Sequence, residues 1–314
     1  MLRFLIVRLS LIFATLLVVS LVIFSATEFL PGDAASVLLG QQATPSSLEN
    51  LRRKMGLDRH PVVRYLDWIG GAARGDLGVS PRSGVSITSM IKRGLPNSAL
   101  LAVAAFIVAV PASVAAGVVV GVRPDSKLDR ILSQGSLLTI SLPEFVTGVL
   151  LMLLFASTLG WLPSSSIMLP GESVWSRPEV LVLPILTITG ALFAYIMRMA
   201  RANVIDVMNS PYVRTAILKG LPMRKVVIRH VLPNAMLPTI TVIANNVGWM
   251  FGGLIIVESV FAYPGVGRLL LMAINTRDVR LLQSTALVIA SVYAFSNLAA
   301  DLLYGILNPR IRLA

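Results

Sequence analysis

The chain has 314 residues, carries a formal net charge of +12 and contains no cysteine. Hydrophobic residues make up 55% of the chain and charged residues only 13%, about half the charged share of an ordinary soluble domain. This composition excludes a single water-soluble core, disulfide bonds and thiolate chemistry, and it indicates long apolar helices in a membrane.

The first apolar run covers residues 9–30 and follows Arg3 and Arg8. It is longer than the apolar part of a signal peptide, and no small-residue cleavage site follows it, so we predict an uncleaved anchor helix. The next stretch, residues 31–97, is polar enough to form a small external domain. Within it, Thr44 is suited to begin a capped helix, and residues 75–78 are typical of a turn.

Five further apolar runs follow, at residues 98–122, 131–159, 180–197, 235–257 and 284–307. Each is near the roughly 20 residues that a helix needs to cross a bilayer. Helices are expected because lipid offers no partners to backbone groups. The predicted fold class is therefore an all-α membrane protein with six transmembrane helices. Its expected parts are an anchor helix (1–30), an external domain (31–97) and a five-helix core (98–314) that contains a cytoplasmic loop (202–234).

Lysine and arginine in the short loops predict the orientation of the chain. With the N-terminus inside, fourteen of these residues fall in cytoplasmic segments, whereas the outside loops hold four, at Arg177, Arg268, Arg277 and Arg280. Cytoplasmic loops are enriched in such residues, so we expect both termini in the cytoplasm. The basic residues between 52 and 93 go against the rule, but long loops are translocated largely regardless of charge. Neither nucleic-acid binding nor a metal site is expected, because no basic segment interleaved with aromatic residues occurs and the two histidines lie far apart.

The most informative segment lies between the fourth and fifth apolar runs. Ser210 is suited to cap a helix and Pro211 to open it, and Gly220 suits the left-handed position that ends a helix. Pro222 is expected to open a second short helix, which Pro233 ends. Helices of this length are not stable alone in water, so each is expected to pack on something else.

The first of these helices is predicted over residues 211–219, with an apolar side made by Tyr212, Val213, Ala216 and Ile217. A short basic helix of this kind suits a groove on a partner protein, and it suits equally well the surface of anionic lipid. A DNA-binding helix-turn-helix shares the glycine turn, but membrane tethering and the lack of base-reading side chains argue against it. The residues expected to make the partner contact are Pro211, Tyr212, Val213, Arg214, Thr215, Ala216, Lys219, Gly220, Leu221, Arg224 and Lys225.

This segment resembles the coupling loop of binding-protein-dependent ABC importer permeases. The general pattern of that loop is Glu-Ala-Ala, three residues, Gly, nine residues, Ile, any residue and Leu-Pro. Gly220 and the Leu-Pro pair at 232–233 keep the spacing, and Arg214, Thr215 and His230 replace the Glu, the first Ala and the Ile. These replacements are similar to the dipeptide/oligopeptide branch, in which Tyr-Val-Arg-Thr-Ala precedes Lys-Gly.

The resemblance extends over nearly the whole chain. Besides the coupling loop, the segments that match the family are residues 75–78 in the external domain, the Phe-x-x-Pro-Gly-x-Gly segment at 261–268, and the C-terminal residues 301–304 and 308–313. Pro211 and Pro222 depart from the residues usual in the family, but both suit helix starts.

The resemblance implies a non-catalytic permease subunit of an ATP-driven importer for dipeptides or oligopeptides in the bacterial inner membrane. Such a permease pairs with a second, homologous permease and with two ABC ATPase subunits, and a periplasmic or lipid-anchored binding protein delivers the substrate. ATP and Mg bind the ATPase subunits, whose closure switches the helix bundle between its inward-open and outward-open states. The chain itself lacks the Gly-x4-Gly-Lys-Ser/Thr phosphate loop, so we expect no catalytic residue and no cofactor in it.

Few charged or amide groups fall inside the predicted spans. Glu144, which follows Pro143, is costly in lipid and is expected to face protein or water. It either meets the amine or another cationic group of a substrate or packs between helices. Asn245 and Asn246 either line the substrate pathway or form hydrogen bonds across helices, and Asp301 is expected to be structural.

Three alternatives remain open. Related permeases import nickel chelates, glutathione, opines or oligosaccharides, and the coupling loop does not distinguish these cargoes. An ion-coupled secondary transporter would use a relay of acidic residues and interrupted helices, for which Glu144 alone is weak support. A non-transporting membrane scaffold or sensor would be isolated without an ATPase.

Overall fold

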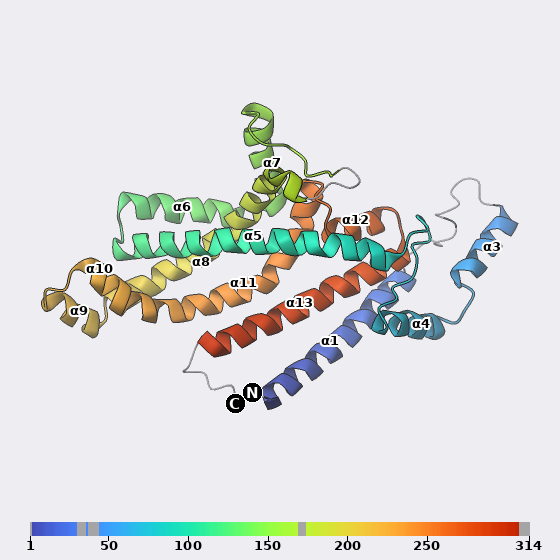
Figure 1. Ribbon diagram of the computed structural model, residues 1–314, viewed down its shortest axis with the longest axis horizontal. Helices are drawn as coiled ribbons and strands as arrows, with labels where there is room; N and C mark the ends of the chain where they lie inside the picture. The colour runs from blue at the N-terminus through green and yellow to red at the C-terminus, as the bar shows by residue number, and fades with distance from the viewer. Residues whose placement is uncertain (1, 30–35, 37–43, 169–173, 308–314) are drawn as a thin grey trace. The chain divides into compact units, whose positions relative to one another are not determined.

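The computed structural model describes residues 2–29, 36, 44–168 and 174–307. Residues 308–313, which carry part of the family resemblance, and much of 30–43 lie outside these ranges. The described residues form helices and no strand longer than the isolated bridge between Val79 and Ser86. The helices are α1 (Leu2–Glu28), α3 (Pro45–Met55), α4 (Pro61–Ala73), α5 (Ile87–Val122), α6 (Lys127–Ser141), α7 (Glu144–Met152), η2 (Leu153–Thr158), η3 (Val174–Ser176), η4 (Pro178–Leu181), α8 (Val182–Met208), α9 (Pro211–Leu218), α10 (Met223–Val226), η5 (Val227–Val231), α11 (Leu232–Val260), α12 (Val266–Asn275) and α13 (Val279–Leu307) (Figure 1).

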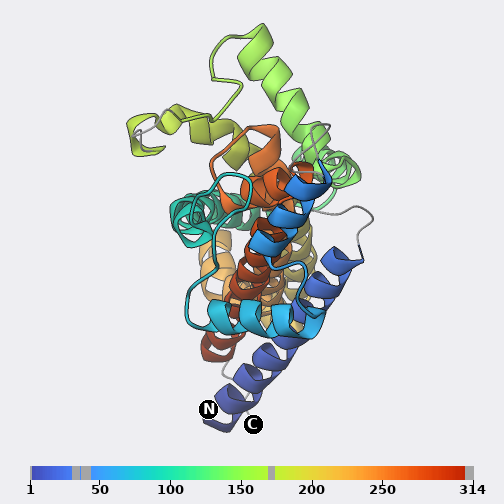
Figure 2. The ribbon, with the colours of Figure 1, turned by 90° about the vertical axis from the view of Figure 1, so that its right-hand side faces the viewer.

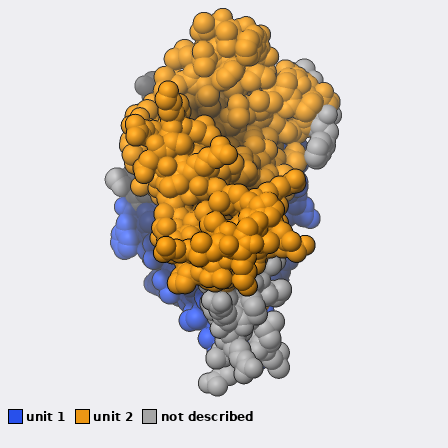
Figure 3. Space-filling view, turned by 90° about the vertical axis from the view of Figure 1, so that its left-hand side faces the viewer, with its two compact units in different colours: residues 1–98, 264–295 blue, residues 99–263, 296–314 orange. Residues whose placement is uncertain are grey.

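Among the described residues, five helical stretches are long and apolar enough to cross a membrane, and a sixth span forms if the bent pair α6 and α7–η2 counts as one. The five stretches are Phe4–Glu28, Ile87–Val122, Pro178–Met208, Met223–Val260 and Val279–Leu302. The predicted all-α membrane fold is therefore confirmed, with six spans when the bent pair is counted as one. The chain forms two compact units: unit 1 comprises Met1–Ser98 and Pro264–Phe295, and unit 2 comprises Ala99–Tyr263 and Ser296–Ala314 (Figure 3).

The prediction of one continuous span over residues 131–159 was wrong. The chain bends by 109° between α6 and α7–η2, and Figure 2 looks nearly along α6, from which α7 leads away at a steep angle. The cause is Pro143, because proline forces the preceding residue out of the helical region. Leu142 is accordingly extended (φ −94°, ψ 131°), and Glu144 lies in the first turn of α7 instead of the middle of a span.

In unit 1, α4 packs beside α1 through aromatic rings. Tyr65 and Trp68 of α4 lie 5.4 and 6.3 Å from the ring of Phe24, and the Tyr65 hydroxyl shares a 2.9 Å hydrogen bond with Ser20. Two of the expected local features are present in this unit. Thr44 caps α3 by accepting a bond from the Ser47 N–H, and the turn at residues 75–78 has glycines of positive φ at both ends.

In unit 2, α8 is the central helix, and it packs most extensively against α11. Helix α5 approaches α8 closely through Gly117 and Gly121, a small-xxx-small spacing that brings membrane helices together. A Cβ at Gly117 would lie 2.6 Å from the Ala200 Cβ, and one at Gly121 would lie 2.8 Å from the Val204 Cβ. Larger residues at these two positions would force α5 away from α8.

Candidate coupling site

Helix α9 begins at Pro211 and ends at Leu218, followed by Gly220 in the left-handed conformation (φ 74°) that we expect of it. The Gly220 N–H donates to the carbonyl of Ile217 (2.9 Å), and the Leu221 N–H donates to that of Ala216 (3.4 Å). This pair of bonds is the Schellman motif, which satisfies the last carbonyls of a helix. The local sequence therefore ends α9 abruptly and separates it from the helix that follows.

Ser210 occupies the N-cap position of α9, but its side chain does not cap the helix. Its hydroxyl donates instead to the carbonyl of Val207, at 2.5 Å. That carbonyl belongs to the last turn of α8, where acceptors lack partners within the helix. The expected cap is thus wrong in detail, because the hydroxyl satisfies the end of α8 rather than the start of α9.

Pro233 does not end the second helix, as the sequence had led us to expect. Helix α10 passes through the π-helical η5 into α11, so that Met223–Val260 is one helical stretch. A proline inside a helix removes one bond and crowds the carbonyl four residues earlier. Pro233 lies in the first turn of α11, just after the π-helical η5, and the wider π turn makes room for it.

A cluster of buried apolar side chains, here called the hairpin core, fixes the hairpin of α9 and α10 to the transmembrane helices. Its buried members are Val204, Val213, Ala216, Val226, Val231 and Ala235. Val118 and Val122 of α5 and Val207 and Met208 of α8 pack against it. The hairpin therefore moves with the adjoining ends of α5, α8 and α11.

We predicted that the apolar residues of α9 lie on one side of the helix. In the structure they face in two directions. Val213 and Ala216 are buried in the hairpin core, whereas Tyr212 and Ile217 are 46% and 41% exposed. Leu218, which the sequence analysis did not single out, is 79% exposed. With 100° between successive helical residues, Leu218 lies opposite Val213 and Ala216, at the centre of the outward side.

The hairpin of α9 and α10 carries four exposed cations: Arg214, Lys219, Arg224 and Lys225. Among the described residues, no carboxylate lies within ion-pair distance of any of them. Together with Tyr212, Leu218 and Met223 they form what we call the outer face of the hairpin. Thr215 and Pro211 are exposed there as well, whereas Leu221 is half-buried against the hairpin core.

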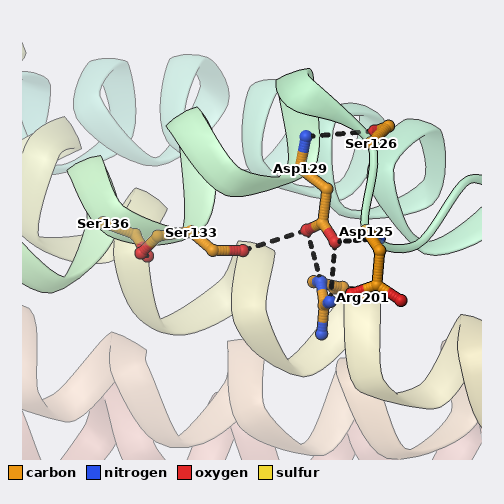
Figure 4. A network of polar contacts seen from close by, with 6 residues as sticks. All are labelled: Asp125, Ser126, Asp129, Ser133, Ser136 and Arg201. Carbon is orange, nitrogen blue, oxygen red and sulfur yellow. Dashed lines mark hydrogen bonds and ion pairs between the residues drawn. The ribbon is translucent and has the colours of Figure 1, made fainter.

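A polar network adjoins the hairpin core and ties α6 to α8 (Figure 4). Asp129, only 2% exposed, accepts two bonds from Arg201, at 2.6 Å from Nε and 2.7 Å from Nη2. The same carboxylate accepts from the Ser133 hydroxyl (3.0 Å) and the Asp125 N–H (2.8 Å). Ser126 caps α6 by accepting from the Asp129 N–H (3.2 Å). A bidentate pair of this kind fixes the orientation of both partners.

The polar residues expected along the substrate pathway lie on α7 and α11. The Glu144 carboxyl packs against Gly253 of α11, where a Cβ would lie 2.6 Å from the carboxyl carbon. Its Oε2 is buried without a hydrogen-bond partner among the described residues. Asn246 donates to the Val242 carbonyl of its own helix (2.8 Å), and Asn245 is exposed. Gly253 thus makes the space that the Glu144 carboxyl fills.

Comparison with protein families decides the class of the protein. The family described as "Binding-protein-dependent transport system inner membrane component" matches residues 109–313, and the N-terminal part of such membrane components matches residues 1–84. The chain belongs to this family. It is a permease subunit of an ATP-driven importer and a multi-pass membrane protein, and it works in a complex with other subunits.

Relatives of the permease match it from end to end. A protein of Brucella suis biovar 1 named as a peptide permease is 36% identical over 318 residues, which cover 99% of each chain. The glutathione transport system permease protein of Escherichia coli O6:H1 is 35% identical over 312 residues, again 99% of each chain. A crystal structure of an amino acid ABC transporter with histidines has the same fold, with a TM-score of 0.53 and 16% identity over 71% of the permease and 95% of that chain.

Membership of this family separates the permease from the ATPase activity that drives it. The permease is not an enzyme, and ATP hydrolysis belongs to partner subunits.

Several residues with clear structural roles were missed by sequence reasoning. Leu218 was missed because the sequence of a short helix does not distinguish an exposed leucine from a buried one. The Asp129–Arg201 pair was missed because the two residues are 72 positions apart in the chain.

Proposed function

We propose that the permease moves dipeptides or oligopeptides across the bacterial inner membrane and that the hairpin of α9 and α10 docks on an ABC ATPase subunit. The observation that carries the docking is the outer face, where Leu218 projects between Arg214 and Lys219. An exposed apolar side chain beside cations that have no carboxylate partner among the described residues suits a protein groove with an apolar floor and an acidic rim.

The outer face fits a protein groove better than a lipid surface. A helix that lies on lipid separates an apolar side from a charged side. In α9 the most apolar side, with Val213 and Ala216, is already buried in the hairpin core. What remains exposed mixes Tyr212, Ile217 and Leu218 with Arg214, Thr215 and Lys219, so no separate apolar side is left to enter a membrane.

The proposed complex contains a second, homologous permease, two ATPase subunits that bind ATP and Mg, and an external binding protein that delivers the substrate. The excess of lysine and arginine in the predicted cytoplasmic segments supports cytoplasmic termini. The hairpin core passes motion of the ATPase subunits to α5, α8 and α11, and the Asp129–Arg201 pair extends it to α6. Helices joined in this way switch together as a rigid body.

Glu144 and Asn245 are the proposed pathway residues for which the structure supplies the best support. The Oε2 of Glu144 is buried without a partner among the described residues, and an unpaired buried acceptor is costly unless another group reaches it. A peptide amine is such a group. Asn246 bonds to its own helix, so its role in the pathway has less support than that of Asn245.

Uptake by the reconstituted transporter tests the cargo. Proteoliposomes that contain both permeases, the ATPase subunits and the binding protein are offered labelled di- and tripeptides, glutathione, a nickel chelate, an opine and an oligosaccharide. We expect ATP-dependent uptake of the peptides. Glutathione is the second candidate, because the relative in Escherichia coli is named for its transport. Uptake of only a chelate, opine or sugar would contradict the proposal.

A further inference from the structure

An aromatic pair joins α8 and α11 on an exposed surface of unit 2. The rings of Tyr195 and Trp249 meet edge to face, with centroids 5.7 Å apart. Both side chains remain open to the surroundings, at 43% and 47% exposure. The pair is therefore not a core contact but part of a surface that something else can touch.

A cation and an amide extend this surface along both helices. Arg198 lies one turn from Tyr195 on α8, and Asn245 lies one turn from Trp249 on α11, and both are exposed. Residues three or four apart share one side of a helix. The four residues thus form one strip, called here the α8–α11 strip. Among the described residues, no carboxylate lies within ion-pair distance of Arg198.

The strip differs in chemistry from the surfaces of the other spans. Large apolar side chains lie exposed along α1, α5 and α6, such as Phe13, Ile107 and Leu138, at 71%, 65% and 69% exposure. Those surfaces suit lipid. A guanidinium and a carboxamide on a spanning helix are costly in lipid and usually face a water-filled path or protein.

We propose that the α8–α11 strip is a substrate contact, in which Arg198 binds the carboxylate of a transported peptide and the Tyr195–Trp249 pair packs against its side chains. Arginine matches a carboxylate with two parallel hydrogen bonds, and aromatic rings supply large contact surfaces. Asn245 donates to or accepts from the peptide backbone. This inference rests on the proposed transport of peptides.

The position of Glu144 agrees with a short peptide on this strip. Its carboxyl packs at Gly253, one turn along α11 from Trp249, and Arg198 lies one turn along α8 from Tyr195. At 1.5 Å per residue, the two charged groups are roughly 10 Å apart along the helices. An extended tripeptide spans about 10 Å. Its amine then meets Glu144 and its carboxylate meets Arg198.

Substitution of Arg198 in the complete reconstituted transporter tests the contact. We expect Arg198→Gln to lower the uptake of a labelled tripeptide about tenfold and Arg198→Lys to keep part of it, with the ATPase subunits still co-purifying. Arg123→Gln, which removes an exposed arginine at the end of α5, serves as the control and is expected to leave uptake unchanged. Wild-type uptake by Arg198→Gln would overturn the inference, whereas a wild type that takes up no peptide would overturn the proposed cargo.

A photo-reactive amino acid identifies what touches the strip. In the complete transporter, benzoylphenylalanine at position 245 is expected to label a radioactive tripeptide upon illumination, and the same group at position 107 is not. Adding Arg198→Gln should reduce the labelling at 245 about tenfold. Labelling of the second permease or of lipid at 245, with no peptide adduct, would show that the strip is an interface or a lipid-facing surface and would overturn the inference.

Discussion

Asp129 at the start of α6 and Arg201 on α8 hold each other in a bidentate ion pair, with N–O distances of 2.6 and 2.7 Å. Asp129→Asn leaves the guanidinium with a neutral partner, so we expect the free energy of unfolding to fall by about 1.5–3 kcal/mol and uptake to fall with it. Thermal unfolding in detergent measures the change.

A double-mutant cycle with Arg201→Gln isolates the pair, and we expect a coupling energy of at least about 1 kcal/mol. Glu179→Gln is the control, because the Arg177–Glu179 pair is 42% and 47% exposed and such pairs contribute about 0–1 kcal/mol. A coupling energy near zero for Asp129 and Arg201 would show that the pair does not hold α6 to α8.

The effect of substituting Gly220 is expected to depend on backbone conformation alone. A Cβ at this position would meet nothing within 4 Å, but the φ of 74° strains any other residue. We expect Gly220→Val to cost about 1–2 kcal/mol and to disturb the stop after α9, so that the complex assembles but loses uptake. Gly220→Asn is the matched control, because asparagine tolerates this region. Equal uptake by the two variants would refute the argument.

Two adjacent glycines of α11 offer a test of the Glu144 packing. A Cβ at Gly253 would lie 2.6 Å from the Glu144 carboxyl carbon, whereas one at Gly252 would meet nothing within 4 Å. We expect Gly253→Ala to lower the unfolding free energy by about 1–3 kcal/mol through overpacking and Gly252→Ala to have little effect. Adding Glu144→Ala to Gly253→Ala should recover stability; if it does not, the clash lies elsewhere.

Leu218 is expected to be a central contact with the ATPase subunit. Leu218→Asp places a charge in the proposed groove, so we expect the ATPase subunits to dissociate during purification while the permease stays folded. Leu128→Asp is the comparison, because Leu128 is an exposed leucine of α6, at 48% against 79% for Leu218. Equal retention of ATPase subunits by both variants would remove Leu218 from the interface.

Much of the fold was predictable because the apolar runs are long and lipid permits few alternatives to helices. The errors lie at prolines. Pro143 breaks the third run, while Pro233 lies within a continuous helix. The same residue type acts differently because Pro233 lies in the first turn of α11, just after the π turn of η5. Sequence reasoning did not foresee this turn.

The candidate site was predictable where it depends on local backbone geometry. Gly220 is one example, because its position after a short helix favours a left-handed residue. The division of α9 between buried Val213 and exposed Leu218 depends on the hairpin core, to which α5, α8, α10, η5 and α11 also contribute. The Asp129–Arg201 pair likewise joins distant parts of the chain. Contacts of this kind require the tertiary structure.

The contact partner of the hairpin is the most direct test of the account. The chain contains no cysteine, so Leu218→Cys supplies a single thiol on the outer face, and Val213→Cys supplies a buried control. A photoactivated, thiol-linked cross-linker is attached in the assembled transporter, and the adducts are identified by mass spectrometry. We predict that position 218 labels an ATPase subunit and that position 213 labels none. Adducts of position 218 with lipid alone, or with the external binding protein, would contradict the assignment of the hairpin as the coupling element.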